Sequence, residues 1–89
     1  MSDLSWAYLQ GANLINTELA GSDLTCADLS GADPSGANLG RTNVHGAKLK
    51  GAKLRGAFLV FTNLIGADLS EVNLNDVDMK YAIVTEDQL

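Results

Sequence analysis

The sequence predicts an all-β solenoid, in which short extended segments and corners wind the chain into a coil. Leucine recurs every fifth residue from Leu4 to Leu89, fills fourteen of the eighteen positions of this grid and never lies off it. The residue two before the grid position is small at fifteen of the eighteen positions, with Ala at ten and Ser or Thr at five. Eight of the nine glycines stand two residues after a grid position. These regularities indicate one repeat array, whose units bury their apolar positions against their neighbours.

A five-residue period excludes a regular α-helix and a long flat strand. On an α-helix each step of five would rotate the apolar position by about 140°, and on a flat strand successive leucines would alternate between faces. Within one unit, an extended Ala-x-Leu segment turns both apolar side chains to the same side. Glycine two residues later suits a turn with positive φ. Each unit is therefore expected to be a short edge followed by a corner.

Three residues depart from the pattern. Pro34 takes a leucine position and has no backbone donor, so we expect one ladder hydrogen bond to be missing near that corner. Val72 and Val77 replace the small residue two before leucine and predict a locally adjusted core near the C-terminus. We interpret these substitutions as tolerated drift in a repeat, with a functional kink as the alternative.

The repeating unit resembles that of a known family. Residues 11–15 (Gly-Ala-Asn-Leu-Ile) and 66–70 (Gly-Ala-Asp-Leu-Ser) resemble the pentapeptide-repeat proteins, and the resemblance runs from residue 2 to about residue 86. It implies a right-handed quadrilateral β-helix with four pentapeptides per coil, about four and a half coils and a single domain over residues 1–89. In that fold the central leucine and the residue two before it point inward, and the other three residues point outward.

The ends of a solenoid expose unpaired strand edges and need covering. At the C-terminus Thr85 fits the N-cap of a helix and Gln88 completes a capping box, so residues 85–89 are expected to start a helical cap. The repeat begins at Ser2 with no cap before it. We expect either that the chain is part of a longer protein or that its bare end pairs with another copy in an end-to-end dimer.

The net charge of −5 is distributed unevenly. The eleven acidic residues lie outside a stretch of fifteen that holds five of the six basic residues, namely Arg41, Lys48, Lys50, Lys53 and Arg55. In the four-unit coil Lys48 stacks between Asp28 and Asp68. Lys53 likewise stacks above Asp33. We interpret this charged ladder as fixing the stacking order, because each exposed pair contributes only about 0–1 kcal/mol.

An anionic partner is the alternative reading of the basic stretch. Nucleic acid is an improbable partner for it, since the flanking carboxylates lower the positive potential that a phosphate backbone needs.

A second column of outward residues is aromatic. Residues twenty apart from Gly21 onward are Arg41, Phe61 and Tyr81, with Phe58 and Val60 on the same side of the coil. Arginine stacked on an aromatic ring gives a cation–π contact worth about 0.5–1 kcal/mol at an exposed site. Phe58, Val60 and Phe61 also form the largest apolar cluster expected to be exposed, so the five residues are either a stabilising ladder or a surface for a protein partner or self-association.

The sequence carries no sign of a membrane segment or of catalytic chemistry. No apolar run approaches the roughly 20 residues that cross a bilayer, and no secretory leader is visible. A cytoplasmic location is expected, with a removed leader for the periplasm or thylakoid lumen as the alternative. Cys26 and His45 are the only residues of their kinds, and no third group is placed to orient the histidine. No catalytic residue, cofactor or metal ligand is therefore assigned.

The favoured function is a non-enzymatic structural or protein-interaction module of unassigned role. The family that it resembles is most abundant in bacteria, cyanobacteria especially. Some members of that family mimic DNA and bind gyrase or other topoisomerases, which is the alternative function. Those members resemble long acidic rods, whereas this chain is short and has a basic middle.

Overall fold

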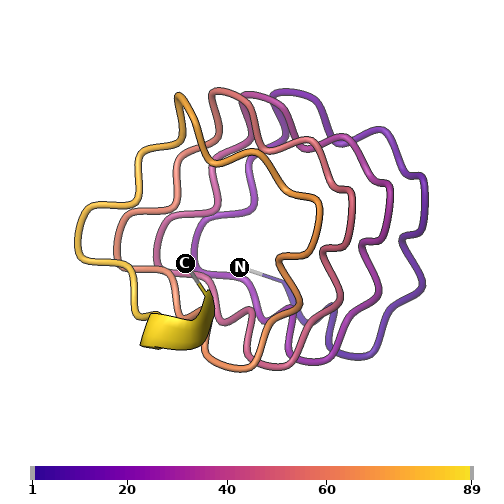
Figure 1. Cartoon of the computed structure of the whole chain (residues 1–89). Helices are drawn as coiled ribbons and strands as arrows, with labels where there is room; N and C mark the ends of the chain where they lie inside the picture. Colours follow the sequence, from indigo (N-terminus) through magenta and orange to yellow (C-terminus); the bar gives the residue numbers. More distant parts are fainter. Residues whose placement is uncertain (1, 89) are drawn as a thin grey trace.

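The chain winds into a β-helix, a stack of roughly square coils that Figure 1 shows from indigo to yellow. The computed structural model describes residues 2–88. Within this range eleven parallel bridges join residues twenty apart, from Asp3 with Asp23 to Asn63 with Ile83. Each bridge is a single residue pair, because the chain turns a corner after every short extended segment. We number the coils by this register as residues 2–21, 22–41, 42–61 and 62–81.

Each corner is a turn closed by one backbone hydrogen bond. The N–H three residues after the central residue donates to the central residue's carbonyl oxygen, as from Ala7 to Leu4 at 3.1 Å. The third residue of the turn has positive φ, and it is glycine at eight described corners and another residue at eight more. Positive φ costs an L-residue about 1–2 kcal/mol. The eight corners without glycine are therefore strained.

The recurrent Asp and Asn residues just before the central residue brace these corners. Their side-chain oxygens accept a hydrogen bond from the backbone N–H two residues later. Thr25 donates in this way to Asp23 Oδ1 at 2.9 Å, and Ile65 donates to Asn63 Oδ1 at 3.0 Å. This Asx turn fixes the entry to the corners that Asp or Asn precedes. The frequency of Asp and Asn thus has a structural cause.

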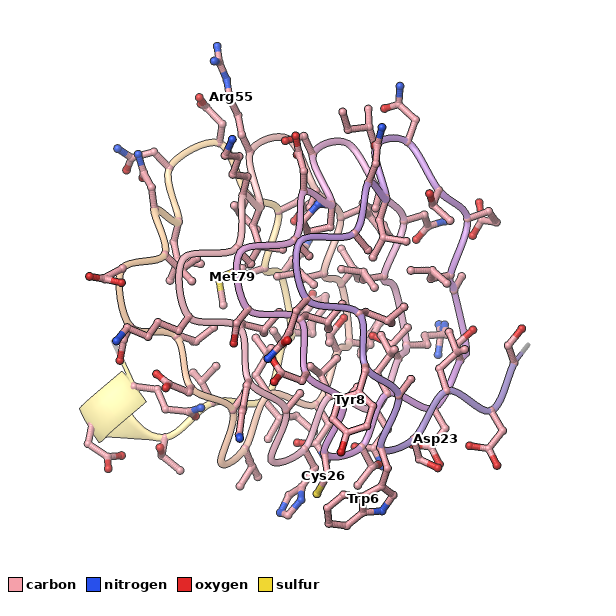
Figure 2. The ribbon with its side chains drawn as sticks, turned by 90° about the vertical axis from the view of Figure 1, so that its right-hand side faces the viewer. Trp6, Tyr8, Asp23, Cys26, Arg55 and Met79 are labelled. Carbon is pink, nitrogen blue, oxygen red and sulfur yellow. The ribbon has the colours of Figure 1, made fainter. Side chains whose placement is uncertain are left out.

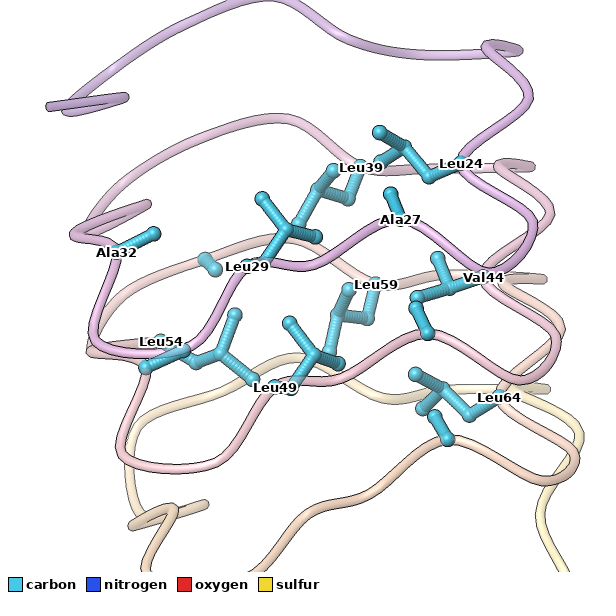
Figure 3. Packing of buried hydrophobic residues seen from close by; sticks show 14 of the residues in the cluster. Leu24, Ala27, Leu29, Ala32, Leu39, Val44, Leu49, Leu54, Leu59 and Leu64 are labelled. Atoms are coloured by element: carbon cyan, nitrogen blue, oxygen red, sulfur yellow. The ribbon is translucent and has the colours of Figure 1, made fainter. Parts of the chain in front are cut away.

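The core is a column of leucines enclosed by the coils, as Figure 3 shows for Leu24, Leu39, Leu54 and others. Full burial of a leucine contributes about 1.5–3 kcal/mol, so the central coils supply most of the apolar stabilisation. The core also holds the hydroxyls of Thr42 and Thr62, which both donate to the carbonyl oxygen of Leu39 at 2.6 Å. The buried polar groups of this column are therefore satisfied.

The ladder of backbone hydrogen bonds between successive coils is interrupted on one side. Pro34 has no N–H to donate to the carbonyl oxygen of Lys53, and the Ser35 hydroxyl lies 3.3 Å from that oxygen as a partial substitute. The neighbouring bonds survive, since Lys53 N–H donates to Ala32 at 3.0 Å and Gly36 N–H donates to Arg55 at 2.9 Å. The missing donor therefore causes a local gap in the second coil.

One coil further on, the same side opens more widely. Among the described residues no backbone hydrogen bond joins Leu54 to Asn73, and Gly56 N–H donates to Asp76 at 3.1 Å, one residue later than the register requires. A groove of about 510 Å³ follows, lined by Lys53, Arg55, Glu71 and Asp76 among others. The inward valines at 72 and 77 stand where the other coils have Ala or Thr, and we attribute the opening to the extra space that these wider side chains require.

The C-terminal coil ends in the 3-10 helix η1, which spans Glu86–Gln88. Gln88 Nε2 donates to the carbonyl oxygens of Leu64 at 2.5 Å and Ala67 at 3.1 Å. Its Oε1 accepts the backbone N–H of Thr85 at 2.8 Å. The side chain of Gln88 thus supplies the donor that a further coil would have brought to the Ala67 carbonyl. It also adds a second donor to the Leu64 carbonyl, which already accepts the turn hydrogen bond from Ala67 N–H.

Candidate interaction surface

Arg41, Phe61 and Tyr81 stack outside the corner that they occupy in successive coils, and we call them the aromatic column. The guanidinium carbon of Arg41 lies 4.7 Å from the centroid of the Phe61 ring. The rings of Phe61 and Tyr81 are stacked, with centroids 5.0 Å apart and planes inclined by 19°. Lys80 Nζ lies 5.2 Å from the Tyr81 centroid. Cations therefore contact both aromatic rings of the column.

The backbone under the aromatic column is strained. Arg41, Phe61 and Tyr81 have φ of 57°, 60° and 62°, in the region that favours glycine. Each such residue costs about 1–2 kcal/mol, whereas an exposed cation–π or aromatic pair returns about 0.5–1.5 kcal/mol. Stacking roughly offsets the strain and adds little net stability. Five further corners without glycine share this strain, so it is the exposed stacking of the side chains that makes the column a candidate for recognition.

Phe58 lies beside the column and covers the backbone of the preceding coil. A Cβ atom built on Gly40 would lie 3.0 Å from Cε2 and 3.2 Å from Cδ2 of the Phe58 ring. Gly40 is buried, and it is the one glycine of the chain without positive φ. Phe58, Val60 and Phe61 also border a hollow of about 270 Å³, whose other lining residues include Ala20 and Arg41. Gly40 therefore makes room for the ring.

The exposed apolar surface is larger than the sequence indicates. Of the eight large hydrophobic residues that the structure exposes, five lie between residues 58 and 83, namely Phe58, Phe61, Ile65, Tyr81 and Ile83. Ile65 and Ile83 were missed by sequence reasoning, although both occupy outward positions in the five-residue pattern. Ile83, half exposed at 50 %, follows Tyr81 across the corner. The apolar surface thus extends onto a second side of the coil.

The charged ladder is built on backbone bridges from Asp28 to Lys48 and from Lys48 to Asp68. Hydrogen bonding from Ser30 lowers the pKa of Asp28, with a smaller contribution from the Lys48 charge. Ser70 lowers the pKa of Asp68 in the same way, and there the contributing cation is Lys50.

Asp33 and Lys53 stack beside the Pro34 gap without a bridge between them among the described residues. The pKa of Asp33 is lowered by its hydrogen bonds from Ser35 and, to a lesser extent, by the charge of Lys53. For all three aspartates of the charged ladder, the serine hydrogen bonds lower the pKa more than the lysine charges do.

Cys26 and His45 are neighbours through the backbone, since Cys26 N–H donates to the carbonyl oxygen of His45 at 2.9 Å. Cys26 lies beside Trp6 on the side of the rod opposite Arg55 (Figure 2), and its Sγ sits over Gly46. Within residues 2–88 no three His, Cys, Asp or Glu side chains come together as metal ligands do. No helix in that range is long and apolar enough to span a membrane.

A parallel β-helix is built here from five-residue units, and side chains of successive coils stack outside one corner. These features define a solenoid repeat protein. The family model for pentapeptide repeats matches residues 2–41 and 42–80 in eight copies. The chain therefore belongs to the pentapeptide-repeat family, as its Gly-Ala-Asn/Asp-Leu units predict.

Two solved cyanobacterial relatives are similar to the chain. Rfr23, a pentapeptide repeat protein from Cyanothece 51142, is 39 % identical with a TM-score of 0.63, over 93 % of this chain and 54 % of that one. The pentapeptide repeat protein alr5209 from Nostoc PCC 7120 is 38 % identical with a TM-score of 0.59, over 84 % of this chain and 62 % of that one. The chain thus spans less than two thirds of either relative.

The chain also shares its fold with QnrB1, a plasmid-mediated fluoroquinolone resistance protein. The identity is 19 % and the TM-score 0.51, over 97 % of this chain and 39 % of that one. No curated protein matches the sequence.

Proposed function

We propose that the chain is a non-enzymatic protein-interaction module, and that its contact surface is the side of the coil that carries the aromatic column. The observation that carries this proposal is the grouping of Phe58, Phe61 and Tyr81, which are exposed together on one side of the coil. Exposed apolar clusters rimmed by polar residues are a mark of interaction sites. Aromatic and arginine side chains are also the residues that carry most binding energy at protein interfaces.

The rod that presents this surface is, in our proposal, a right-handed quadrilateral β-helix of about four and a half coils, with residues 1–89 as one domain. The twenty-residue register of the bridges supports four units per coil. A start of a helical cap at residues 85–89 is supported by the hydrogen bond from Thr85 N–H to Gln88 Oε1. A rigid rod suits recognition, because its outward side chains keep fixed spacings along the axis.

Photo-crosslinking in the native cells tests this function. A photoreactive phenylalanine analogue that replaces Val60 should crosslink to a protein, and Phe61→Asp in the same chain should abolish the adduct. The same analogue at the exposed Lys50, on another side of the coil, is the matched control and should give no specific adduct. If Val60 and Lys50 give the same adducts, or if Val60 gives none, the proposed interaction surface is wrong.

A further inference from the structure

We infer that the groove between the third and fourth coils binds the C-terminal carboxylate end of another polypeptide. The groove lies on the side of the coil formed by residues 51–56 and 71–76. The aromatic column stands outside a different corner, so this inference goes beyond the proposed function and does not depend on it. The two surfaces can therefore be tested separately.

The groove presents backbone groups that have no partner within the chain. On the other three sides the third and fourth coils are joined in register, for example by Leu49 N–H to the carbonyl oxygen of Asp68 at 2.9 Å. On this side, among the described residues, Leu54 N–H has no acceptor and neither the N–H nor the C=O of Asn73 is paired. Ala52 C=O likewise accepts no hydrogen bond there. Both edges of the groove therefore offer a donor and an acceptor to a peptide group.

The Leu54 N–H is the group that most needs a partner. Leu54 is only 1 % exposed, although it lines the groove. A buried N–H without an acceptor is rare in folded proteins, because removing it from water without a hydrogen bond is costly. Such a group calls for a specific explanation. An oxygen atom of a ligand that reaches into the groove would supply the acceptor.

Lys53 and Arg55 give the middle of the groove a positive charge. They flank Leu54 in the third coil, and both side chains are exposed. The residues opposite them in the fourth coil are Asn73 and Asn75, which are uncharged. Hydrogen bonds from backbone N–H groups, lysine and arginine to a carboxylate are charge-assisted and strong. The middle of the groove therefore suits a carboxylate.

The adjoining side of the same coils shows what Lys53 lacks. There Lys48 is bridged to aspartates in both neighbouring coils. Lys53 also has an aspartate in the preceding coil, Asp33, but in the following coil it faces Asn73 across the groove. A carboxylate bound in the groove would give Lys53 the second acidic neighbour that Lys48 has.

The two ends of the groove are closed and acidic. Gly51 N–H donates to the carbonyl oxygen of Ser70 at 3.0 Å, and Gly56 N–H donates to that of Asp76 at 3.1 Å. A strand cannot run past these joined corners between the coils, whereas a chain terminus can enter from outside and end in the groove. Glu71 and Asp76 are exposed at the ends, where they favour a basic residue in the entering chain and disfavour a second carboxylate. The fitting ligand is a C-terminus with small last residues and a basic residue before them.

Nitrogen–proton NMR of the full chain, titrated with the peptide acetyl-Lys-Gly-Ala, tests this assignment. With a free C-terminal carboxylate, the peptide should shift the amide resonances of Leu54 and Asn73, with a dissociation constant of about 0.1–1 mM. The same peptide with a C-terminal amide should bind about tenfold more weakly, since it brings no charge to the two cations. Leu49 is the internal control and should not shift, because its N–H is already bonded to Asp68.

Charge-removing variants test the two cations. Lys53→Gln and Arg55→Gln should each weaken binding of the carboxylate peptide about threefold to tenfold. Lys48→Gln removes the same charge from the adjoining side, where the coils are paired, and is the matched control. It should leave the affinity unchanged. Circular dichroism of each variant checks that the fold is intact.

Sodium acetate separates a polypeptide terminus from a free small carboxylate. The peptide should bind about tenfold tighter than acetate or more, because its amide N–H also pairs with a free carbonyl of the groove. Equal affinities for peptide and acetate overturn the inference, as do equal affinities for the acid and amide peptides. Leu54 and Asn73 resonances that no ligand moves overturn it too, as does binding that is unchanged in both cation variants. None of these results bears on crosslinking from Val60, which tests the proposed function on a different side.

Discussion

The ring of Phe58 lies across the backbone of Gly40, one coil earlier in the chain, at 3.0 Å from the position that a Cβ atom would take. This pair explains why a glycine is present where the turn itself requires none. Asn38 Oδ1 is also close to that position, at 3.1 Å, but it accepts the Gly40 N–H in an Asx turn. Ser30 makes the same turn with Asp28 while carrying a Cβ atom. The contact with the Phe58 ring is therefore what distinguishes Gly40 from Ser30.

Gly40→Ala should therefore change stability with a sign that depends on Phe58. In the natural chain we expect a loss of about 1–3 kcal/mol, from overpacking against the ring. In a Phe58→Ala background the same change should stabilise by about 0.4–1 kcal/mol, because alanine restricts the unfolded chain. Urea unfolding of the four proteins measures both. Equal effects of Gly40→Ala in the two backgrounds would show that the ring is not the cause.

Replacing Phe61 separates backbone strain from stacking. Phe61→Ala removes the stacking on Arg41 and Tyr81 but keeps a side chain at φ 60°. Phe61→Gly removes the same contacts and also relieves the strain. We expect the glycine variant to be more stable than the alanine variant by about 1 kcal/mol in thermal or urea unfolding. At Ser30, which is not a positive-φ corner, glycine should instead be less stable than alanine. A more stable Phe61→Ala variant would contradict the strain argument.

The leucine grid was enough to predict the family, the solenoid and the residues that share a column. Because the side chains of a solenoid recur at fixed intervals, sequence position alone determines that Arg41, Phe61 and Tyr81 follow one another along the rod. The contact of Phe58 with Gly40 was not predictable in this way. It depends on the direction in which one ring leans, which periodicity does not specify.

The open groove was predicted only in part. Pro34 indicates one missing donor, and the structure has that gap. The wider opening, where Leu54 has no bond to Asn73 and Gly56 N–H donates to Asp76, was not predictable, because the effect of Val72 and Val77 on the register depends on packing in three dimensions. The donation from Gln88 Nε2 to Leu64 and Ala67 was also missed. A capping box predicts the contact with Thr85 but not the second use of the same amide.

Gln88 can be tested for its role at the C-terminal edge. Gln88→Ala should lower the free energy of unfolding by about 0.5–1.5 kcal/mol, through loss of its hydrogen bonds. Gln88→Glu keeps an acceptor for Thr85 but loses the donor to Leu64 and Ala67, so it should not restore stability. The control is Gln10→Ala, which removes the exposed bond to Asp28 Oδ2 and should cost less than about 0.5 kcal/mol. Faster amide exchange confined to the last coil in Gln88→Ala would locate the effect.

Acid should weaken the fold through its Asx turns. Hydrogen bonds from Ser70 hold the folded-state pKa of Asp68 below its ordinary value of 3.8, and those from Ser35 do the same for Asp33. A carboxyl with a lowered pKa contributes stability that is fully present above pH 3.8 and is lost as the pH falls through the folded pKa. Urea unfolding between pH 7 and pH 2 should show this decline, since these aspartates ionise less readily when unfolded.

The Ser70→Ala variant provides the matched test of that assignment. It removes the hydroxyl donor, so carbon-detected NMR titration should find the pKa of Asp68 closer to 3.8. The pKa of Asp33 should not move in the same sample, because Ser35 is intact. An unchanged pKa of Asp68 would mean that the Ser70 hydroxyl does not hold it below its ordinary value.

The basic residues of the third coil bear on the DNA-mimic alternative. A protein that replaces DNA on a gyrase surface must present carboxylates along its length, whereas Lys48, Lys50 and Lys53 interrupt the acidic surface here. We expect no inhibition of gyrase supercoiling, and no protection from a gyrase poison, at micromolar chain. The triple variant Lys48→Glu/Lys50→Glu/Lys53→Glu replaces three of the six basic residues with acidic ones and serves as the comparison. Inhibition by the natural chain at these concentrations would reject the argument from charge and favour the mimic.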